Sequence, residues 1–448
     1  MSKVLPTIGP ATESRENLKK ILKYSNLVRI NGAHNTLQWH KDISNLIKKK
    51  RETKILLDLP GVKPRTDNSK IHKIKKNQKV IFFHKKCKLK KILKIKTTAP
   101  FPKIAKNVKN FSISDGKYIF KIKKIGKDFI IATSTENFEL DPKKGINIPN
   151  SVYNEKIQKK LYLSFLRKAK GIKFDAIGLS YVQSPELIKH IRKFDKNLII
   201  VSKIENLEGL KNIDKISKNS DVIMVDRGDL SAEIGEHKLF SAMEEISKIV
   251  KNNGKPLIIA TENLESMIFR KGSTTPTKSE IVSLAHSKNL FADRIMLSDE
   301  TATSKNWMNI IRWLDSFLKK LEKNKIKRKN KTDIFWNAVS QIKNMPIVLF
   351  SKKGYALEKI NQTDDQCNLT VFTDSKKIKS FCDFKSNTKC FLVKNFTKSK
   401  ASKFIYNNIR KYKKVIFSRE NSAVLIYVAY PRKNSRANTF SVISKKDF

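Results

Sequence analysis

The chain has 448 residues, of which 39% are hydrophobic, so about two or three globular domains are expected. Its formal net charge of +53 comes mostly from lysine spread over every segment, which favours a compositional bias over specific nucleic-acid recognition. No apolar run approaches the roughly 18 residues of a membrane span, the start lacks the apolar core of a signal peptide, and the cysteines show no CxxC spacing. We therefore expect a soluble, cytoplasmic protein with reduced thiols and no membrane or specific nucleic-acid partner.

Short apolar runs recur along the chain, and most are followed by a stretch with helical periodicity. The predicted strands are 4–8, 27–31, 54–58, 175–180, 198–205, 221–225, 255–261 and 293–297. Examples of the predicted helices between them are 14–25, 184–194, 239–253 and 279–290. Eight strand–helix units predict an α/β fold, a (β/α)8 TIM barrel with its active site at the carboxyl ends of the strands.

The connection after Arg65 breaks this alternation, because about 80 residues precede the next predicted helix near Glu155, far more than an ordinary connection needs. Segments 78–84, 117–125 and 128–134 within it are predicted to be short strands, with turns at 114–116 and 126–127. We interpret this connection as an inserted β domain after the third strand, placed to close over the barrel mouth.

A further unit follows the charged segment 321–333. Its predicted strands, 345–350, 369–373, 390–394 and 414–418, are separated by helical or loop segments and indicate a smaller α/β domain. The complete prediction is a barrel formed by 1–66 and 151–325, an inserted β domain at 67–150 and a C-terminal α/β domain at 340–448.

Charged residues follow two successive predicted strands within segment 201–230. Lys203 and Glu205 alternate along the first strand and therefore point to one face. Glu205 and Asp229 carry hard oxygen ligands of the kind that Mg²⁺ uses in proteins. For an isolated Lys-x-Glu pattern, the simpler interpretation is an ion pair inside the barrel.

Gly228 and Arg29 favour a functional interpretation instead. Gly228 lets the backbone approach a ligand and expose its N–H groups to an anion. Arg29 ends another predicted strand and adds a cation suited to phosphate. Together these residues indicate phosphoryl transfer, in which catalysis consists mainly of positioning and charge neutralisation.

Eight motifs then carry a family resemblance. They are TIGPAT at 7–12, VRINGAHNT at 28–36, LLDLPGVKPRT at 56–66, SKIENLEGL at 202–210, DVIMVDRGDL at 221–230, ATENLESM at 260–267, PTKSE at 276–280 and IMLSDETA at 295–302. In their order and spacing the chain resembles the pyruvate kinase family over nearly its whole length, and SRANTFSVI at 435–443 resembles that family's closing strand less closely. The family fold has the same three pieces.

The resemblance implies an enzyme that transfers the phosphoryl group of phosphoenolpyruvate to ADP, giving ATP and pyruvate in the last step of glycolysis. It also implies a homotetramer and a requirement for Mg²⁺, with Mn²⁺ as an alternative. Two other functions stay open: another Mg²⁺-dependent barrel enzyme acting on pyruvate or an enolate, and a catalytically faded, basic binding homologue.

The resemblance also implies a role for each site residue. Lys203 and Arg29 are expected to stabilise the charge of the transferring phosphoryl group, and Glu205 and Asp229 to hold the Mg²⁺. Backbone N–H groups around Gly228 are expected to fix the substrate carboxylate. The other expected contacts are Thr261 at the face where the enolate is protonated, and Asn31, His34 and Arg65 near the nucleotide phosphates.

The chain departs from the family at the K⁺ site. The matching positions are Asn31, Ala33, Asp58 and Leu59, so two oxygen-bearing side chains are missing. Lys63, in GVKPR, resembles the lysine of potassium-independent members, whose ammonium replaces the monovalent cation. We therefore expect activity without K⁺; the plainer alternative is that Lys63 is one more surface lysine.

Three further departures add carboxylates. Asp226 stands where the family usually has alanine, Glu262 replaces a glutamine, and Asp299 replaces a glycine. Carboxylates near an anionic substrate are unfavourable unless they face solvent or pair with a cation. These positions indicate either harmless changes around the site or a slower or altered enzyme.

Overall fold

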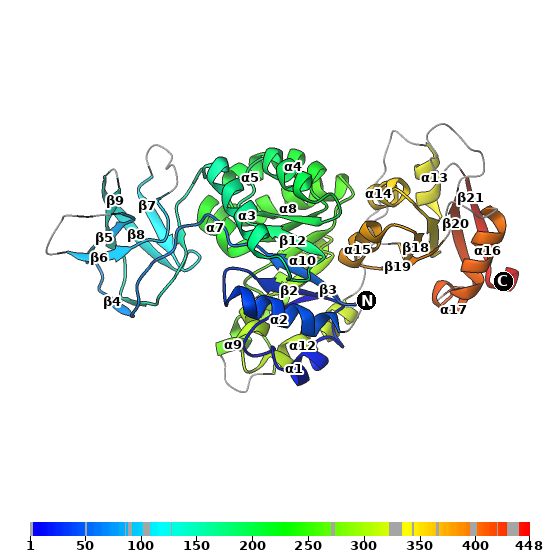
Figure 1. The fold of residues 1–448 in the computed structure, drawn as a ribbon, viewed down its shortest axis with the longest axis horizontal. Helices are drawn as coiled ribbons and strands as arrows, with labels where there is room; N and C mark the ends of the chain where they lie inside the picture. Colours follow the sequence, from blue (N-terminus) through cyan, green and yellow to red (C-terminus); the bar gives the residue numbers. More distant parts are fainter. Residues whose placement is uncertain are drawn as a thin grey trace.

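The protein is described by a computed structural model covering residues 3–49, 52–85, 87, 92–101, 108–126, 128–269, 274–321, 334–342, 345–363, 367–394, 401–418, 420–427 and 439–448. A barrel lies at the centre, with a β domain on one side and an α/β domain on the other (Figure 1). Most of the predicted charged segment, 322–333, lies outside the described residues, as do 127 and 435–438.

The barrel closes through eight parallel strands in the order β1-β16-β15-β14-β13-β12-β3-β2. The prediction of a (β/α)8 barrel is therefore confirmed, and the first three strands have the predicted bounds. The strands are β1 (Val4–Ile8), β2 (Leu27–Asn31), β3 (Lys54–Asp58), β12 (Ala176–Leu179), β13 (Ile199–Ile204), β14 (Val222–Asp226), β15 (Leu257–Ala260) and β16 (Arg294–Leu297).

Alternation along these strands separates two apolar cores. On β13, Ile199 and Val201 belong to the core inside the barrel, whereas Ile200 and Ile204 pack in the core beneath the surrounding helices. Because both faces are covered, the strands are apolar almost throughout, which is why short continuous apolar runs located them.

Helices surround the barrel and follow its strands. The helix predictions at 14–25, 184–194, 239–253 and 279–290 correspond to α1, α4, α8 and α10. Serine or threonine side chains cap three of these four helices, and Thr277 and Glu280 form a reciprocal capping box at α10. The set is α1 (Arg15–Ile21), α2 (Leu37–Lys48), α3 (Glu155–Lys168), α4 (Pro185–Phe194), α5 (Leu207–Lys211), α6 (Ile213–Asn219), α7 (Arg227–Ile234), α8 (Glu236–Asn252), α9 (Ser266–Phe269), α10 (Lys278–Asn289), α11 (Asp299–Ala302) and α12 (Trp307–Lys320).

A separate β unit is inserted between β3 and α3. Its six-stranded sheet has the order β11-β7-β8-β9-β5-β6, and β4 pairs with β10 beside it. The aromatic rings of Phe82, Phe111 and Phe120 pack together at its core. Its strands are β4 (His72–Ile74), β5 (Lys79–Phe83), β6 (Leu93–Lys96), β7 (Asn110–Ile113), β8 (Tyr118–Ile125), β9 (Phe129–Ser134), β10 (Phe138–Leu140) and β11 (Ile146–Asn147).

The turn between β7 and β8 contacts the barrel mouth. Ser114, Asp115 and Gly116 have φ values of 57°, 54° and 93°, which confirms the predicted turn. The carboxylate of Asp115 lies 2.8 Å from Nζ of Lys63, and Nζ of Lys117 lies 2.7 Å from Glu265 beyond β15. The inserted unit therefore covers one side of the mouth.

The C-terminal unit is a five-stranded sheet with the order β19-β18-β17-β20-β21. One strand prediction here is wrong: 414–418 falls on α17 and the turn after it, and the strand is Ser422–Tyr427. Ile416 and Phe417 are buried from a helical turn, and a short apolar run has no periodicity that separates this from a strand. The elements are α13 (Ile334–Gln341), β17 (Ile347–Phe350), α14 (Tyr355–Thr363), β18 (Leu369–Thr373), α15 (Lys376–Phe384), β19 (Thr388–Leu392), α16 (Ala401–Lys411), α17 (Lys413–Ile416), β20 (Ser422–Tyr427), β21 (Thr439–Ser444) and the 3₁₀ turn Lys445–Asp447.

The end of α15 joins this unit to the end of the barrel opposite the mouth. Phe384 is fully buried among the residues that fill the barrel interior. The backbone N–H of Ser386 donates to Asp293 at 2.9 Å, and Arg294 donates to the carbonyl of Asp383. The domain boundaries expected from the sequence, at 66/67, 150/151 and 325–340, stay a prediction. Within the described ranges, no helix is both long and apolar enough to cross a membrane.

Candidate active site

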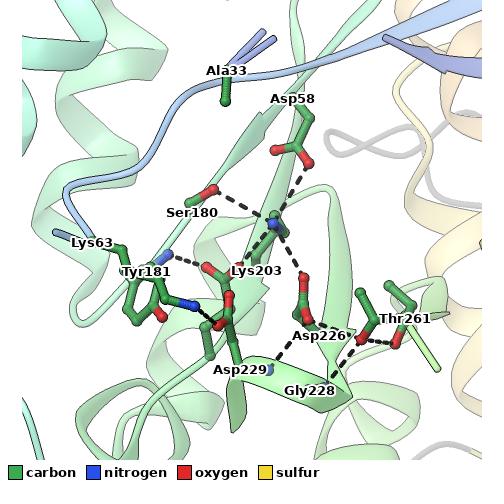
Figure 2. Close-up of polar contacts among 12 residues, drawn as sticks. Ala33, Asp58, Lys63, Ser180, Tyr181, Lys203, Asp226, Gly228, Asp229 and Thr261 are labelled. Carbon is green, nitrogen blue, oxygen red and sulfur yellow. Dashed lines mark hydrogen bonds and ion pairs between the residues drawn. The ribbon is translucent and has the colours of Figure 1, made fainter. Parts of the chain in front are cut away.

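The candidate site lies where the inward-facing positions of the strands change from apolar to charged. Figure 2 shows the polar contacts among its residues. On β13, Ile199 and Val201 point into the barrel, and Lys203 and Glu205 continue the same alternation at its mouth. Val222 and Met224 on β14 lead in the same way to Asp226. The barrel pattern therefore delivers several charged side chains to one place.

Lys203 is the centre of this group. Its Nζ atom lies 2.8 Å from Oε1 of Glu205 and 3.5 Å from a carboxylate oxygen of both Asp58 and Asp226. Burial opposes the charged form of Lys203, but these three carboxylates outweigh it and raise the pKa well above the usual lysine value. The side chain is therefore a permanently charged ammonium in a buried position.

Arg29 adds a second buried cation from β2. Its Nε and Nη2 atoms lie 2.9 and 2.8 Å from Oδ2 of Asp58, and Nη1 donates to the Thr7 hydroxyl at 3.0 Å. Burial raises the pKa of Asp58, but Lys203 and Arg29 lower it below the usual range overall. Asp58 is therefore an anion that orients both cations toward the mouth.

Glu205, Asp226 and Asp229 form an acidic cluster. Each contributes one carboxylate oxygen, and the three oxygens lie within 4.8 Å of one another. Burial, together with the negative charges of Asp226 and Asp229, raises the pKa of Glu205 to about 8 despite the neighbouring Lys203. Gathered carboxylates of this kind suit a hard divalent cation such as Mg²⁺.

Backbone and amide donors fix two members of the acidic cluster. The backbone N–H of Tyr181, a residue with φ of 51° after β12, donates to Oε2 of Glu205. Nδ2 of Asn147 donates to Asp229 at 3.0 Å. Tyr181 and Asn147 were not anticipated from the sequence, because these contacts depend on tertiary packing.

Lys63 is buried, so the surface-lysine alternative is wrong. Its Nζ atom contacts Asp229 directly and lies 2.8 Å from Asp115 of the inserted unit. A Cβ atom at Gly145 would lie 2.6 Å from Cε of Lys63, so glycine makes room for the lysine. Burial opposes the charge on Lys63, but Asp115 and Asp229 raise its pKa above the usual value. Asp58, at a position matching the family's K⁺ site, pairs with Arg29 and Lys203, and replacement of K⁺ by Lys63 stays a prediction.

Arg227 shapes the turn that carries Thr261. Thr261 and Glu262 have φ values of 61° and 51°, an unfavourable conformation for side chains of this kind. The Arg227 guanidinium donates to the carbonyls of both residues, with Nη2 at 2.7 Å from each. The Thr261 hydroxyl donates to Asp226 at 2.9 Å and accepts from the Gly228 N–H at 3.1 Å. No role for Arg227 was predicted from the sequence.

The residues predicted near the nucleotide phosphates lie at the edge of the site. Asn31 ends β2, and its side chain accepts from the Ala33 N–H at 3.0 Å. Arg65 donates to the carbonyl of Lys143 at 3.1 Å. Partial burial and the nearby charges of Arg65 and Arg29 lower the pKa of His34, so these cations face a common region.

The structure thus brings most predicted residues together and adds Asp226 to them. Asp226 is 7% exposed and pairs with Lys203, whereas Glu262 and Asp299 are exposed. Asp226 could have been predicted as a site residue from the sequence, because it occupies the next inward-facing position after Val222 and Met224 on β14.

The fold and the site define a (β/α)8 barrel protein with buried lysine and arginine cations beside a carboxylate cluster at the strand ends. A family model described as "Pyruvate kinase, barrel domain" matches residues 1–310. The chain belongs to the pyruvate kinase family, as the sequence motifs predicted.

Individual relatives agree with this assignment. The pyruvate kinase of Thermotoga maritima is 28% identical over 336 residues, which cover 72% of this chain and 71% of the relative. That of Clostridium perfringens is 28% identical over 412 residues, 84% of this chain and 86% of the relative. The cytosolic isozyme of Nicotiana tabacum is 31% identical over 327 residues, 67% of this chain and 62% of the relative.

Proposed function

We propose that this protein catalyses transfer of the phosphoryl group of phosphoenolpyruvate to ADP, giving pyruvate and ATP. The observation that carries this proposal is the buried Lys203, which has Asp58 and Arg29 on one side and the acidic cluster on the other. A fixed ammonium beside a guanidinium and a cation site is what a phosphoryl group in transfer requires.

Lys203 and Arg29 act on the transferring phosphoryl group. Their charges are held in place by Asp58, so little reorganisation is needed when negative charge develops on the phosphoryl oxygens. Glu205 and Asp229 would hold Mg²⁺, for which Mn²⁺ could substitute. When bound, the ion would supply positive charge that neutralises substrate oxygens and polarises the enolate oxygen.

The residues around Gly228 and Thr261 contact the carboxylate and the enolate carbon of the substrate. Gly228 is the second residue of α7 (Arg227–Ile234), whose first turn presents backbone N–H groups that attract the substrate carboxylate. Thr261 stands at the face where the enolate receives its proton. Asn31, His34 and Arg65 contact the nucleotide phosphates from the edge of the mouth.

Lys63 makes the reaction independent of K⁺. It supplies a buried positive charge next to Asp229, and the chain lacks two of the side chains that hold K⁺ in related proteins. We also propose that the protein works in the cytoplasm as a homotetramer, with the inserted β domain at 67–150 and the C-terminal domain at 340–448.

The test is product formation from phosphoenolpyruvate, ADP and MgCl₂, with pyruvate and ATP measured separately. Equal amounts of the two products are expected. Pyruvate without ATP would indicate hydrolysis or another enolate reaction, and no product would indicate a catalytically faded homologue. Either result would contradict the proposal.

A further inference from the structure

Asp226 is a buried carboxylate that the proposed reaction does not yet use. It ends β14, is 7% exposed and lies beside Glu205 and Asp229. Burial of a carboxylate is unfavourable unless a cation or hydrogen bonds compensate for lost hydration. A charged Asp226 inside the barrel mouth therefore needs a cation or hydrogen-bond donors close to its carboxylate.

The hydrogen bonds of Asp226 hold its carboxylate in one orientation. Its Oδ1 atom accepts from the Thr261 hydroxyl at 2.9 Å and lies 3.5 Å from the Asp229 backbone nitrogen. Its Oδ2 atom faces Lys203, at 3.5 Å from Nζ. Figure 2 shows Asp226 between Lys203 and Thr261, so one oxygen is anchored while the other faces the site.

The positive charge around Asp226 falls short of the negative charge. The Lys203 ammonium is shared among Asp58, Glu205 and Asp226, and it lies closest to Glu205, at 2.8 Å. Lys63 pairs with Asp229 and Asp115, and Arg29 pairs with Asp58. Among the described residues, Asp226 pairs with the shared Lys203 and has Arg227 as a further nearby cation, and an added divalent cation would reduce the remaining excess of negative charge.

We propose that Asp226 is a third carboxylate ligand of the divalent cation, so that this chain binds Mg²⁺ or Mn²⁺ through three protein carboxylates. The inference rests on the proposed function for the other two ligands, Glu205 and Asp229. Mg²⁺ commonly uses one or two protein carboxylates and completes its coordination with water and substrate phosphates. A third carboxylate makes cation binding less dependent on the substrate, so the cation binds the free protein.

A purely structural role for Asp226 makes a different prediction. Asp226 is also the N-cap residue of α7. Asparagine caps helices about as well as aspartate, so Asp226→Asn preserves the cap and removes the charge. Asp226→Ala removes both the helix cap and the charge, and it introduces the alanine that related proteins usually have at this position. Glu262→Gln is the matched control, because Glu262 is a nearby carboxylate outside the acidic cluster.

The experiment titrates the full-length, substrate-free protein with MnCl₂ and follows free Mn²⁺ by electron paramagnetic resonance. We expect the Kd for Mn²⁺ to rise about tenfold or more in Asp226→Asn and Asp226→Ala, and to stay unchanged in Glu262→Gln. Circular dichroism and thermal unfolding establish whether each variant is folded. If Asp226→Ala is unfolded, the Kd of Asp226→Asn alone decides the test.

Glu205→Gln separates the two levels of the proposal. If Glu205→Gln weakens Mn²⁺ binding while Asp226→Asn binds as the parent does, the third ligand is wrong and the proposed pair stands. If neither variant changes the Kd, the cation site of the proposed function is itself wrong. If both weaken binding, the three-carboxylate site is supported.

Discussion

The Nζ atom of Lys203 lies 2.8 Å from Oε1 of Glu205, and both side chains are almost completely buried. This ion pair joins the residue proposed to act on the phosphoryl group to a residue proposed to hold the cation. A buried charge that loses its partner is strongly destabilised, so the two functions are physically linked.

Lys63 provides the first prediction. The parent should be equally active in NaCl and KCl, because Lys63 supplies the positive charge internally. Lys63→Met should lower kcat by about 100-fold, comparable to the loss of one preorganised donor. Steady-state rates in the two salts measure both effects, with the exposed Lys123→Met as the control. A strict K⁺ requirement in the parent would overturn this account.

Arg227 provides the second prediction. Lysine cannot reproduce the planar fork that holds the carbonyls of Thr261 and Glu262, so Arg227→Lys should misplace the Thr261 hydroxyl. We expect kcat to fall by about 10- to 100-fold, with the KM for ADP nearly unchanged. Arg312→Lys, at an exposed position, serves as the control. An unchanged kcat in Arg227→Lys would show that the turn needs no such support.

Glu233 gives a prediction for pH dependence. Burial raises its pKa to about 8, although Ser151 donates to its carboxylate. Between its unfolded pKa, about 4.3, and this folded value, the folded state retains a proton that the unfolded state has lost. The free energy of unfolding should therefore fall as pH rises through this window, by at most about 1.4 kcal/mol per pH unit from this group.

Glu233→Gln isolates this contribution. Glutamine keeps an acceptor for Ser151 but cannot ionise, so the variant should show a shallower decline in stability from pH 5 to 8. Urea unfolding at several pH values measures the difference between the parent and the variant. Parallel stability curves for the two proteins would rule out a raised pKa at Glu233.

Phe384 tests the junction between the barrel and the C-terminal unit. Its ring is fully buried in the barrel interior core, so Phe384→Ala should destabilise the fold by about 3 to 5 kcal/mol. Phe240→Ala, at a side chain that is 59% exposed, should change stability little. Denaturant unfolding compares the two, and equal losses would mean that Phe384 does not anchor the unit.

The barrel was predictable because each strand is a short apolar run that ends in polar residues. β1, β2 and β3 match their predicted bounds, since burial on both faces makes each a short, mostly apolar run. The run at 414–418 failed because helix and strand both bury Ile416 and Phe417. Sheet pairing with β17 selected the strand at Ser422–Tyr427 instead.

The candidate site was predictable only where strand alternation governs it. Lys203, Glu205 and Asp226 follow from the inward series on β13 and β14, although Asp226 was given no role. The contact between Lys63 and Asp115 has no such signal, because it depends on how the inserted unit packs on the barrel. The backbone N–H of Tyr181 donates to Glu205 from a left-handed backbone conformation, and a tyrosine in the sequence does not predict that conformation.

The most direct test of the proposed phosphoryl transfer compares the parent with Lys203→Met and with the exposed Lys211→Met, measuring ATP formed from phosphoenolpyruvate and ADP with Mg²⁺. We expect activity in the parent and in Lys211→Met, and a loss of at least about 100-fold in kcat for Lys203→Met. No ATP from the parent, or equal kcat values in the parent and Lys203→Met, would contradict the account.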